Sequence, residues 1–426
     1  MKRHGMFGLA AFATAGALLV AGCGSSGTAP TSGQQESTPE EVELVLTTWG
    51  EFGYSEEVLA QFTAEHPGVT VTHRKASSSG EARDATTTYL AAGSGLGDVI
   101  AIESAWLPEM MEYADKWVPV PENLADRWGG WKSAPATGTD GVMRMYGVDG
   151  APVGICFNRD LFAQAGLPTD RAGVATLLTG DWDHYYSVGE QFSAATGVPW
   201  TNSATAIGEA QFRGLEYASQ MPDGKVIATT DPTVRKVYDT TVAHIDIMAR
   251  MRNGSDDWNK GLGQNAFATQ LCPSWMLGVI KAAAPDSTSW DLADVFPGNS
   301  INWGGSYLAV PTQTKHPELA TALADYLTSP ETQLVTFENV GAFPSQVEAL
   351  ASPKPLGIVD PFFQDVPMGE IFAARANAIT ARPFNGPLSL QILSSFNDAV
   401  ARVEAGTASA DESWATFVSD VESLTR

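Results

Sequence analysis

Apolar residues in this chain form short runs separated by turn-forming and polar residues. In residues 148–161 (VDGAPVGICFNRDL), an Asp-Gly turn precedes a short apolar run, and Asn158 then opens a helix. An apolar run of this length that ends at a capping residue is typical of a buried strand in an α/β sheet. Residues 301–311 (INWGGSYLAVP) have the same character and also precede a helix. We interpret both runs as crossings between two lobes, with a functional cleft between them.

The chain before the first crossing alternates between strand-like and helix-like patterns. Strands are expected at 42–47, 69–73 and 98–102, with one helix capped by Ser55 and another at about 81–92. Such alternation predicts an α/β fold with a largely parallel sheet that is covered on both faces. Beyond 161 the patterns predict helices at 181–195 and 205–220, a short strand at 198–200, and a long helix from Asp231-Pro232.

Aromatic and acidic residues follow two of the expected strands. Residues 49–52 and 103–106 lie where the strands at 42–47 and 98–102 end. Open α/β sheets bind ligands beyond the carboxyl ends of their strands. We therefore look for binding residues at these two positions.

Length and charge limit the class of protein. The chain has 426 residues, more than one hydrophobic core usually covers, so two domains are expected. The formal net charge is -24, which argues against a nucleic-acid partner because phosphate binding needs a basic surface. Net charge says little about a small-molecule substrate.

The N-terminus has the pattern of an export signal. Lys2 and Arg3 precede an apolar run at 6–20 that is too short for a comfortable membrane span. Residues 20–23 (VAGC) resemble the lipobox of bacterial lipoproteins, which implies that a signal peptide of residues 1–22 is removed and that Cys23 carries lipid. The alternative is an ordinary secretory signal with a chance cysteine. The Gly-, Ser- and Thr-rich residues 23–40 predict a flexible tether.

Four segments, in order, resemble the extracellular solute-binding proteins of family 1, the carbohydrate-importer class similar to maltose-binding protein. They are 93–103 (GSGLGDVIAIE), 146–167 (YGVDGAPVGICFNRDLFAQAGL), 263–275 leading to Trp275, and 303–346 (WGGSYLAVP to GAFPSQ). Gly97 replaces the usual proline of the first segment, and Cys156-Phe157 replaces a tyrosine pair in the second. The likeness runs from about residue 42 to the C-terminus.

The resemblance implies a two-lobed periplasmic-binding-protein fold with three inter-lobe crossings and a sugar between the lobes. The crossings would fall near 147–153, 302–308 and 341–344. Lobe one would be 41–149 plus 303–340, and lobe two 150–302 plus 341–426. The implied partners are the permease subunits of an ABC importer and a di- or oligosaccharide. We expect an extracytoplasmic monomer that touches the membrane through lipid on Cys23 only and has no cofactor, metal or catalytic residue.

Cys156 and Cys272 both fall in the expected lobe two. In an oxidising compartment they could form a disulfide. Two buried thiols that pack as small hydrophobic groups are the alternative. The sequence leaves both open.

A sugar offers a C–H face to aromatic rings and hydroxyl groups to carboxylates and amides, so its pockets combine apolar walls with a few placed polar groups. A tryptophan often packs in a core instead, and an acid is often solvated or caps a helix. Asp98 begins a strand and is expected to accept backbone hydrogen bonds. The expected ligand-binding residues are Trp49, Glu51, Ser79, Glu103, Trp106, Trp200, Asn202, Trp258, Ser274, Trp275, Trp303, Gly304 and Asn385.

Two other classes of function compete with this interpretation. A lipid-anchored glycosidase would use paired acids, for which Glu51 and Glu103 are the candidates. The sequence contains none of the common hydrolase, metalloprotease or nucleotide-binding motifs, and its six histidines are scattered. A binder of polyamine or another solute on the same fold would also use acids between aromatic rings. A tethered sensor subunit would differ only in its partner.

Overall fold

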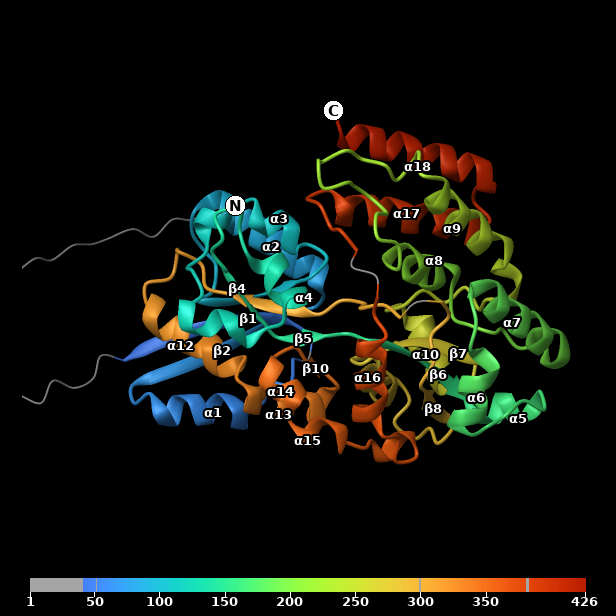
Figure 1. The fold of residues 1–426 in the computed structure, drawn as a ribbon, viewed down its shortest axis with the longest axis horizontal. Coiled ribbons are helices and arrows are strands. Elements are labelled where there is room, and N and C mark those ends of the chain that lie inside the picture. The colour runs from blue at the N-terminus through green and yellow to red at the C-terminus, as the bar shows by residue number, and fades with distance from the viewer. Residues whose placement is uncertain (1–40, 51, 299, 381–382) are drawn as a thin grey trace, which may run out of the picture. The chain divides into compact units, whose positions relative to one another are not determined.

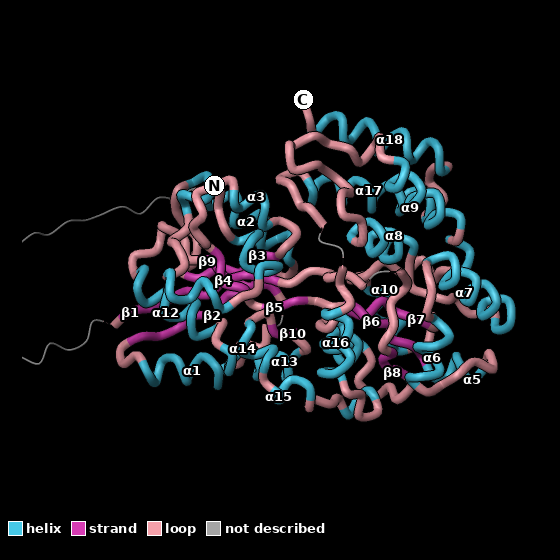
Figure 2. Tube along the Cα trace, viewed as in Figure 1, coloured by secondary structure: helices cyan, strands magenta, loops and turns pink. Residues whose placement is uncertain are grey.

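The computed structural model describes residues 41–426 except 51, 299 and 381–382 (Figure 1). The expected signal peptide, the tether and Cys23 therefore lie outside the described residues, and so does Glu51. The described strands form three sheets, of five, three and two strands, with helices around them (Figure 2).

The first sheet has the strand order β2-β1-β3-β9-β4. β1 is parallel to β2 and β3, whereas β9 is antiparallel to β3 and β4. The apolar residues of this sheet share one core with helices α1, α3 and α12. We call this sheet and its helices the first lobe. Its strands are β1 (Val42–Trp49), β2 (Val69–Ala76), β3 (Val99–Glu103), β4 (Met145–Gly147) and β9 (Ser306–Ala309), and its helices include α1 (Glu56–Glu65), α2 (Ser79–Ala92), α3 (Leu107–Met111), α4 (Gly130–Ser133) and α12 (Pro317–Leu327).

The second sheet has the order β7-β6-β8, and β6 (Val153–Asn158) is antiparallel to both neighbours. Val153 and Ile155 enter one core, while Cys156 enters another, as the two-residue period of a strand requires. Both faces of the sheet are therefore buried, and we call this sheet with its two cores the second lobe. Its other strands are β7 (Thr269–Pro273) and β8 (Trp290–Ala293). One core includes α5 (Arg159–Gln164), α6 (Arg171–Leu178), α7 (Trp182–Thr196), α8 (Ala204–Arg213), α9 (Pro232–Ala243), α17 (Ser389–Glu404) and α18 (Ala410–Leu424), and the other includes α10 (Asp256–Gly263), α11 (Met276–Ala283) and α16 (Met368–Asn377).

Local patterns predicted several of these elements correctly. The Ser55 and Asn158 side chains accept hydrogen bonds from the first turns of α1 and α5, which confirms both helix starts. Asp98 accepts a hydrogen bond from the backbone N–H of Val45 (2.8 Å), also as expected. The prediction of a strand at 198–200 is wrong. These residues form no strand, and the neighbouring Thr201 makes only isolated bridges. The helix expected at 205–220 ends at Arg213, since the following residues turn back to contact the loop after residue 382.

The expectation of a largely parallel sheet is confirmed in the first lobe, where β9 alone of the five described strands of that sheet runs against the others, whereas the sheet of the second lobe is antiparallel. β6 starts beside the crossing segments, at Val153. β7 ends opposite that same residue, at Pro273, so it must run back toward the crossing. β8 also runs back. Strands that return to the point where the chain entered are necessarily antiparallel to the strand that left it.

The three expected crossing segments lie side by side. β5 (Asp149–Gly150) pairs with β10 (Phe343–Pro344), and Pro152 forms a bridge with Asn302. β10 follows α13 (Pro330–Val340) and precedes α14 (Val347–Ala351) and α15 (Pro353–Leu356).

Hydrogen bonds between two of the crossing segments fall into two sets. Asp149 Oδ1 accepts from the backbone N–H (2.7 Å) and the hydroxyl (2.6 Å) of Ser306. Ala151 donates to Asn302 Oδ1 (2.6 Å) and accepts from the backbone N–H of Trp303 (2.8 Å). Gly304 and Gly305 separate the two sets on one segment. Their φ angles of 106° and 96° favour glycine strongly.

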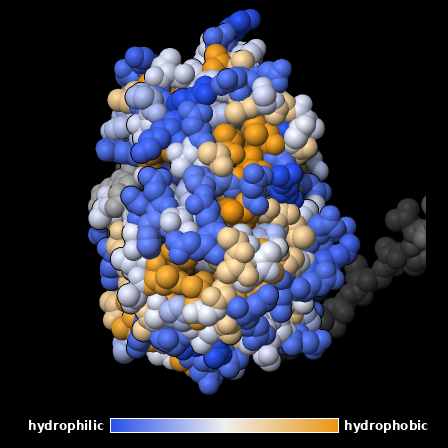
Figure 3. Space-filling view, turned by 90° about the vertical axis from the view of Figure 1, so that its right-hand side faces the viewer, coloured by the Kyte–Doolittle hydropathy of each residue, from blue (hydrophilic) through white to orange (hydrophobic). Residues whose placement is uncertain are grey.

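Figure 3 shows one face of the molecule, on which hydrophilic residues surround smaller hydrophobic areas. Within the described part of the chain, none of the helices has the length and apolar character needed to cross a membrane.

Lys132 of α4 is buried beneath the first crossing, with 1% of its surface exposed. Its ammonium group donates to the backbone oxygen of Asp149 (2.6 Å) and lies 3.8 Å from the centre of the Tyr307 ring. Burial lowers the pKa of Lys132 to about 7, and the Asp149 carboxylate opposes that shift.

We predict that the stability of the protein rises between about pH 7 and pH 9 because of Lys132. The unfolded chain keeps the lysine proton in this window while the folded chain releases it, so the free energy of unfolding increases by up to about 1.4 kcal/mol per pH unit. Urea denaturation across this range should show a steeper rise for the wild type than for Lys132→Met. Equal slopes would contradict the buried lysine.

A disulfide joins Cys156 of β6 to Cys272 of β7, with their Cα atoms 5.5 Å apart and a separation of 116 positions in the sequence. A cross-link over so long a segment restricts the unfolded chain. We predict that replacing both cysteines with alanine lowers the free energy of unfolding by about 2–4 kcal/mol. A reductant should lower the stability of the wild type by a similar amount and leave the double variant unchanged. Wild-type stability that a reductant does not change would refute this prediction.

Candidate functional site

The candidate site begins where β1 and β3 end, at the edge of the first lobe. Trp106 donates from its indole N–H to Ser79 Oγ (3.0 Å), and Ser79 donates to Glu103 Oε2 (2.6 Å). The Trp49 ring lies 6.2 Å from the Trp106 ring. Trp106 is only 1% exposed, so it supports Ser79 and presents little surface to a ligand.

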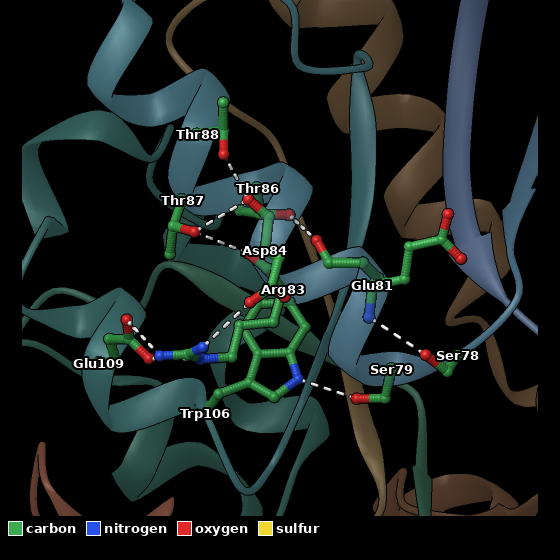
Figure 4. A network of polar contacts seen from close by, with 11 residues as sticks. Ser78, Ser79, Glu81, Arg83, Asp84, Thr86, Thr87, Thr88, Trp106 and Glu109 are labelled. Carbon is green, nitrogen blue, oxygen red and sulfur yellow. Dashed lines mark hydrogen bonds and ion pairs between the residues drawn. The ribbon is translucent and has the colours of Figure 1, made fainter. Parts of the chain in front are cut away.

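An ion pair holds the two helices that carry this group. Arg83 of α2 donates to both carboxylate oxygens of Glu109 of α3, over 2.7 Å and 3.0 Å. In Figure 4, this pair lies beside the contact between Ser79 and Trp106. A bidentate pair fixes orientation as well as distance, so it positions Ser79 for Glu103.

The second lobe contributes a carboxylate whose two oxygens are both occupied. Glu209 Oε1 accepts from Arg213 Nε (2.7 Å) and from the Trp303 indole N–H (3.1 Å). Its Oε2 accepts from Asn397 Nδ2 (2.9 Å). α8 carries both Glu209 and Arg213, which are one helical turn apart. Glu209 therefore orients the guanidinium group of Arg213.

The charges of Arg213 and Glu209 act on Glu103, and Arg213 lines a hollow. The pKa of Glu103 is raised, and burial is the largest cause. The charges of Glu209 and Asp149 also raise this pKa, whereas the charge of Arg213 and the hydrogen bond from Ser79 lower it. Leu390 of α17 packs against the first-lobe core. The empty space of the hollow is about 380 Å³, a volume that includes open solvent. The first lobe contributes Ala105 to its lining. The second lobe contributes Phe212, Arg213, Leu215, Ala218, Ser219, Pro383, Phe384, Asn385, Ser389, Leu390 and Leu393.

Eight of the residues expected from the sequence lie in or beside this arrangement. Trp275 donates from its indole N–H to the backbone oxygen of Trp303 (3.3 Å). A Cβ atom on Gly304 would lie 3.8 Å from that same nitrogen of Trp275. Asn385 is exposed and lines the hollow. The eight are Trp49, Ser79, Glu103, Trp106, Trp275, Trp303, Gly304 and Asn385.

Four expected residues lie elsewhere, inside the second lobe. Trp200 is fully buried and stacks on Phe162, because residues 198–200 enter the core and do not form the expected strand with a free end. Asn202 and Trp258 use their side-chain donors on internal partners, the Met251 backbone oxygen and Gln270. Ser274 is buried and donates to the backbone oxygen of Gly150 (3.4 Å).

Sequence reasoning missed Arg213, Glu209 and Asn397. A Glu–Arg pair four residues apart on a helix is normally a solvent-exposed pair. No local pattern indicates that Glu209 also accepts hydrogen bonds from Trp303 and Asn397, which are distant in the sequence.

Residues 57–357 match a family model described as bacterial extracellular solute-binding protein. A solved structure described as an extracellular solute-binding protein of family 1 is 39% identical; the match covers 90% of this chain and 100% of that one, with a TM-score of 0.81. The chain belongs to the bacterial extracellular solute-binding proteins. No curated protein matches it.

Other solved structures share the fold of this solute-binding protein at low identity. An ABC-transporter-associated binding protein from B. animalis subsp. lactis Bl-04, solved with β-1,6-galactobiose, is 19% identical over 88% of this chain and 96% of its own, with a TM-score of 0.75. The cyclic α-maltosyl-1,6-maltose binding protein from Arthrobacter globiformis is 17% identical over 90% and 98%, with a TM-score of 0.66. These matches confirm the two-lobed α/β fold expected from the sequence. The lobe limits and the number of crossings stay predictions.

We predict that Glu209→Gln destabilises the solute-binding protein by about 1–2 kcal/mol, because an amide cannot accept from both Arg213 and Asn397 in the same arrangement. Urea denaturation measures the effect. Glu216→Gln, which alters an exposed residue shortly after α8, is the matched control and should unfold like the wild type. Equal stability of the two variants would show that the contacts of Glu209 are dispensable.

Proposed function

We propose that this protein is the lipid-anchored solute-binding component of an ABC importer, which binds a di- or oligosaccharide between its lobes and delivers it to the permease. One observation carries the proposal. Arg213, held by Glu209 in the second lobe, lines a hollow together with Ala105 of the first lobe, and its charge lowers the pKa of Glu103 in that first lobe.

The groups around this hollow suit a sugar. The carboxylate of Glu103 accepts hydrogen bonds from hydroxyl groups, and the guanidinium group of Arg213 donates them. Trp49 and Phe384 are partly exposed aromatic residues at opposite ends of the network, which could pack against C–H faces. More than one aromatic position favours a ligand of more than one sugar unit. Two structural neighbours described as binding β-1,6-galactobiose and cyclic α-maltosyl-1,6-maltose agree with this class.

Export and anchoring rest on the N-terminal sequence. The lipobox-like residues 20–23 would place lipid on Cys23, and residues 23–40 would tether the folded body to the membrane. The family is extracellular, which agrees with export.

Ligand binding would favour a closed arrangement of the lobes. A ligand that contacts both lobes stabilises the arrangement in which both sets of contacts form at once. A ligand held by one lobe alone has no differential contacts and shifts nothing. The permease would recognise the closed surface.

The hydrogen bonds that Glu209 accepts weaken the glycosidase alternative. Glycosidases need a pair of carboxyl groups that are free to act as nucleophile, acid or base. Glu51, the expected partner of Glu103, lies outside the described residues. Glu209, whose charge raises the pKa of Glu103, already accepts hydrogen bonds from Arg213, Trp303 and Asn397 on its two oxygens. Chromogenic glycosides should therefore stay intact in the presence of the protein.

We predict that at least one sugar among maltose, trehalose, cellobiose, β-1,6-galactobiose and xylo-oligosaccharides stabilises the purified protein, by about 2.7 kcal/mol at 100 times its dissociation constant. Calorimetry should then show binding to Arg213→Gln that is at least about tenfold weaker, while the exposed control Arg252→Gln binds like the wild type.

Three results would contradict the proposal. Binding of spermidine without any sugar would favour the polyamine alternative. Hydrolysis of a glycoside would favour an enzyme. Unchanged affinity in Arg213→Gln would show that the ligand lies elsewhere.

A further inference from the structure

The polar groups that line the hollow are few. Among the described residues of its lining, Arg213 is the only charged one, and most of the others are apolar. The hydroxyl groups of Ser219 and Ser389 lie 2.5 Å apart and hydrogen-bond to each other, and Ser389 Oγ also accepts from the backbone N–H of Gly386 (2.8 Å). Asn385 is exposed. Arg213 and Asn385 are therefore the main polar side chains that the lining offers to a ligand.

Arg213 keeps most of its hydrogen-bond donors free. A guanidinium group has five N–H donors, one on Nε and four on the two Nη atoms. The Nε of Arg213 donates to Glu209 Oε1 (2.7 Å). Within the part of the chain that the structure describes, neither Nη atom of Arg213 has an acceptor, and neither is enclosed without a partner. Both Nη atoms are therefore open to solvent, on a residue that lines the hollow.

Glu209 fixes the direction of these donors. Its Oε1 accepts from Arg213 and from the indole N–H of Trp303, and its Oε2 accepts from Asn397. A carboxylate held by three donors cannot turn freely, so the guanidinium group keeps one orientation before a ligand arrives. The pair of Arg213 and Glu209 is neutral as a whole. It therefore selects a ligand through directed N–H groups rather than through a net positive charge.

We propose that Arg213 binds an acidic unit of the ligand, so that the preferred di- or oligosaccharide contains a uronic acid. This inference rests on the proposed function and names the class of sugar. The two oxygens of a carboxylate match two parallel N–H groups of a guanidinium. A hydrogen bond to an ionised acceptor is about twice as strong as one to a neutral acceptor, so a carboxylate gains more from Arg213 than a hydroxyl does.

The surroundings of Arg213 favour this contact. Only 19% of its side chain is exposed, and the apolar lining of the hollow limits competition from water. The negative charge of Glu209 acts in the opposite direction. Glu209 is bound at Nε, however, so a carboxylate at the two Nη atoms lies closer to the guanidinium group than to Glu209. Because Coulomb energy falls with distance, the attraction exceeds the repulsion.

Matched pairs of oligosaccharides test the inference. Each pair contains a neutral sugar, namely cellobiose, β-1,6-galactobiose or xylotriose, and its counterpart that carries one glucuronic or galacturonic acid unit. Calorimetry is carried out on the purified full chain at pH 7, where the uronic acid is ionised. The acidic member should bind at least about tenfold more tightly than the neutral member in at least one pair, equivalent to about 1.4 kcal/mol.

Three variants separate the donors of Arg213 from the overall charge. Arg213→Gln should lower the preference for the acidic member at least about tenfold. Arg213→Lys keeps the positive charge but has no pair of parallel donors, and it should lower the preference at least about threefold. Arg252→Gln removes the same charge from an exposed position and should leave the preference unchanged. Thermal unfolding without ligand checks that each variant is folded. If Arg213→Gln does not fold, the wild-type preference and Arg213→Lys decide the question.

The outcomes distinguish this inference from the function on which it rests. If the neutral member of every pair binds the wild type as tightly as its acidic counterpart, or if Arg213→Gln leaves the preference unchanged, Arg213 does not bind an acidic unit, while sugar binding stands. If no member of any pair binds, the proposed function is wrong and the inference fails with it.

Discussion

The carboxylate of Glu209 joins three segments that are far apart in the sequence. It holds Arg213 on its own helix, Trp303 on a crossing segment and Asn397 on α17. Because all three are donors, the negative charge is fully used inside the protein, and the guanidinium group of Arg213 is held at one angle. The orientation of Arg213, which lines the hollow, depends on this contact.

The same contact explains why the two sides of the hollow are electrostatically unequal. On the second-lobe side, charge is neutralised before any ligand arrives. On the first-lobe side, Glu103 has one hydroxyl partner, and Ser79 brings no positive charge. Glu103 is partly exposed, and a carboxylate with one hydrogen bond keeps acceptor positions open. The two carboxylates therefore differ, because the oxygens of Glu209 are used inside the protein.

Local sequence patterns predicted the elements well and the side-chain environments less well. A helix cap such as Ser55 acts within four residues, so its chemistry is visible in the sequence. The direction of β7 depends on where the chain must return, which no local pattern contains. Trp200 and Trp303 are both buried tryptophans of the second-lobe core, yet one stacks on Phe162 and the other donates a hydrogen bond to Glu209. Only tertiary packing distinguishes them.

The hydrogen bonds at the crossing segments join each segment to its neighbour. Asp149 is bonded to Ser306, and Ala151 is bonded to Asn302 and Trp303. The glycines between these residues are held as well, because Gly304 accepts from Asn302 Nδ2 (2.8 Å) and Gly305 accepts from Ser104 Oγ (2.6 Å). Since Trp303 also donates to Glu209, the crossing segment is tied to the carboxylate that orients Arg213, so the backbone between the lobes and the charged residue at the hollow form one hydrogen-bonded network.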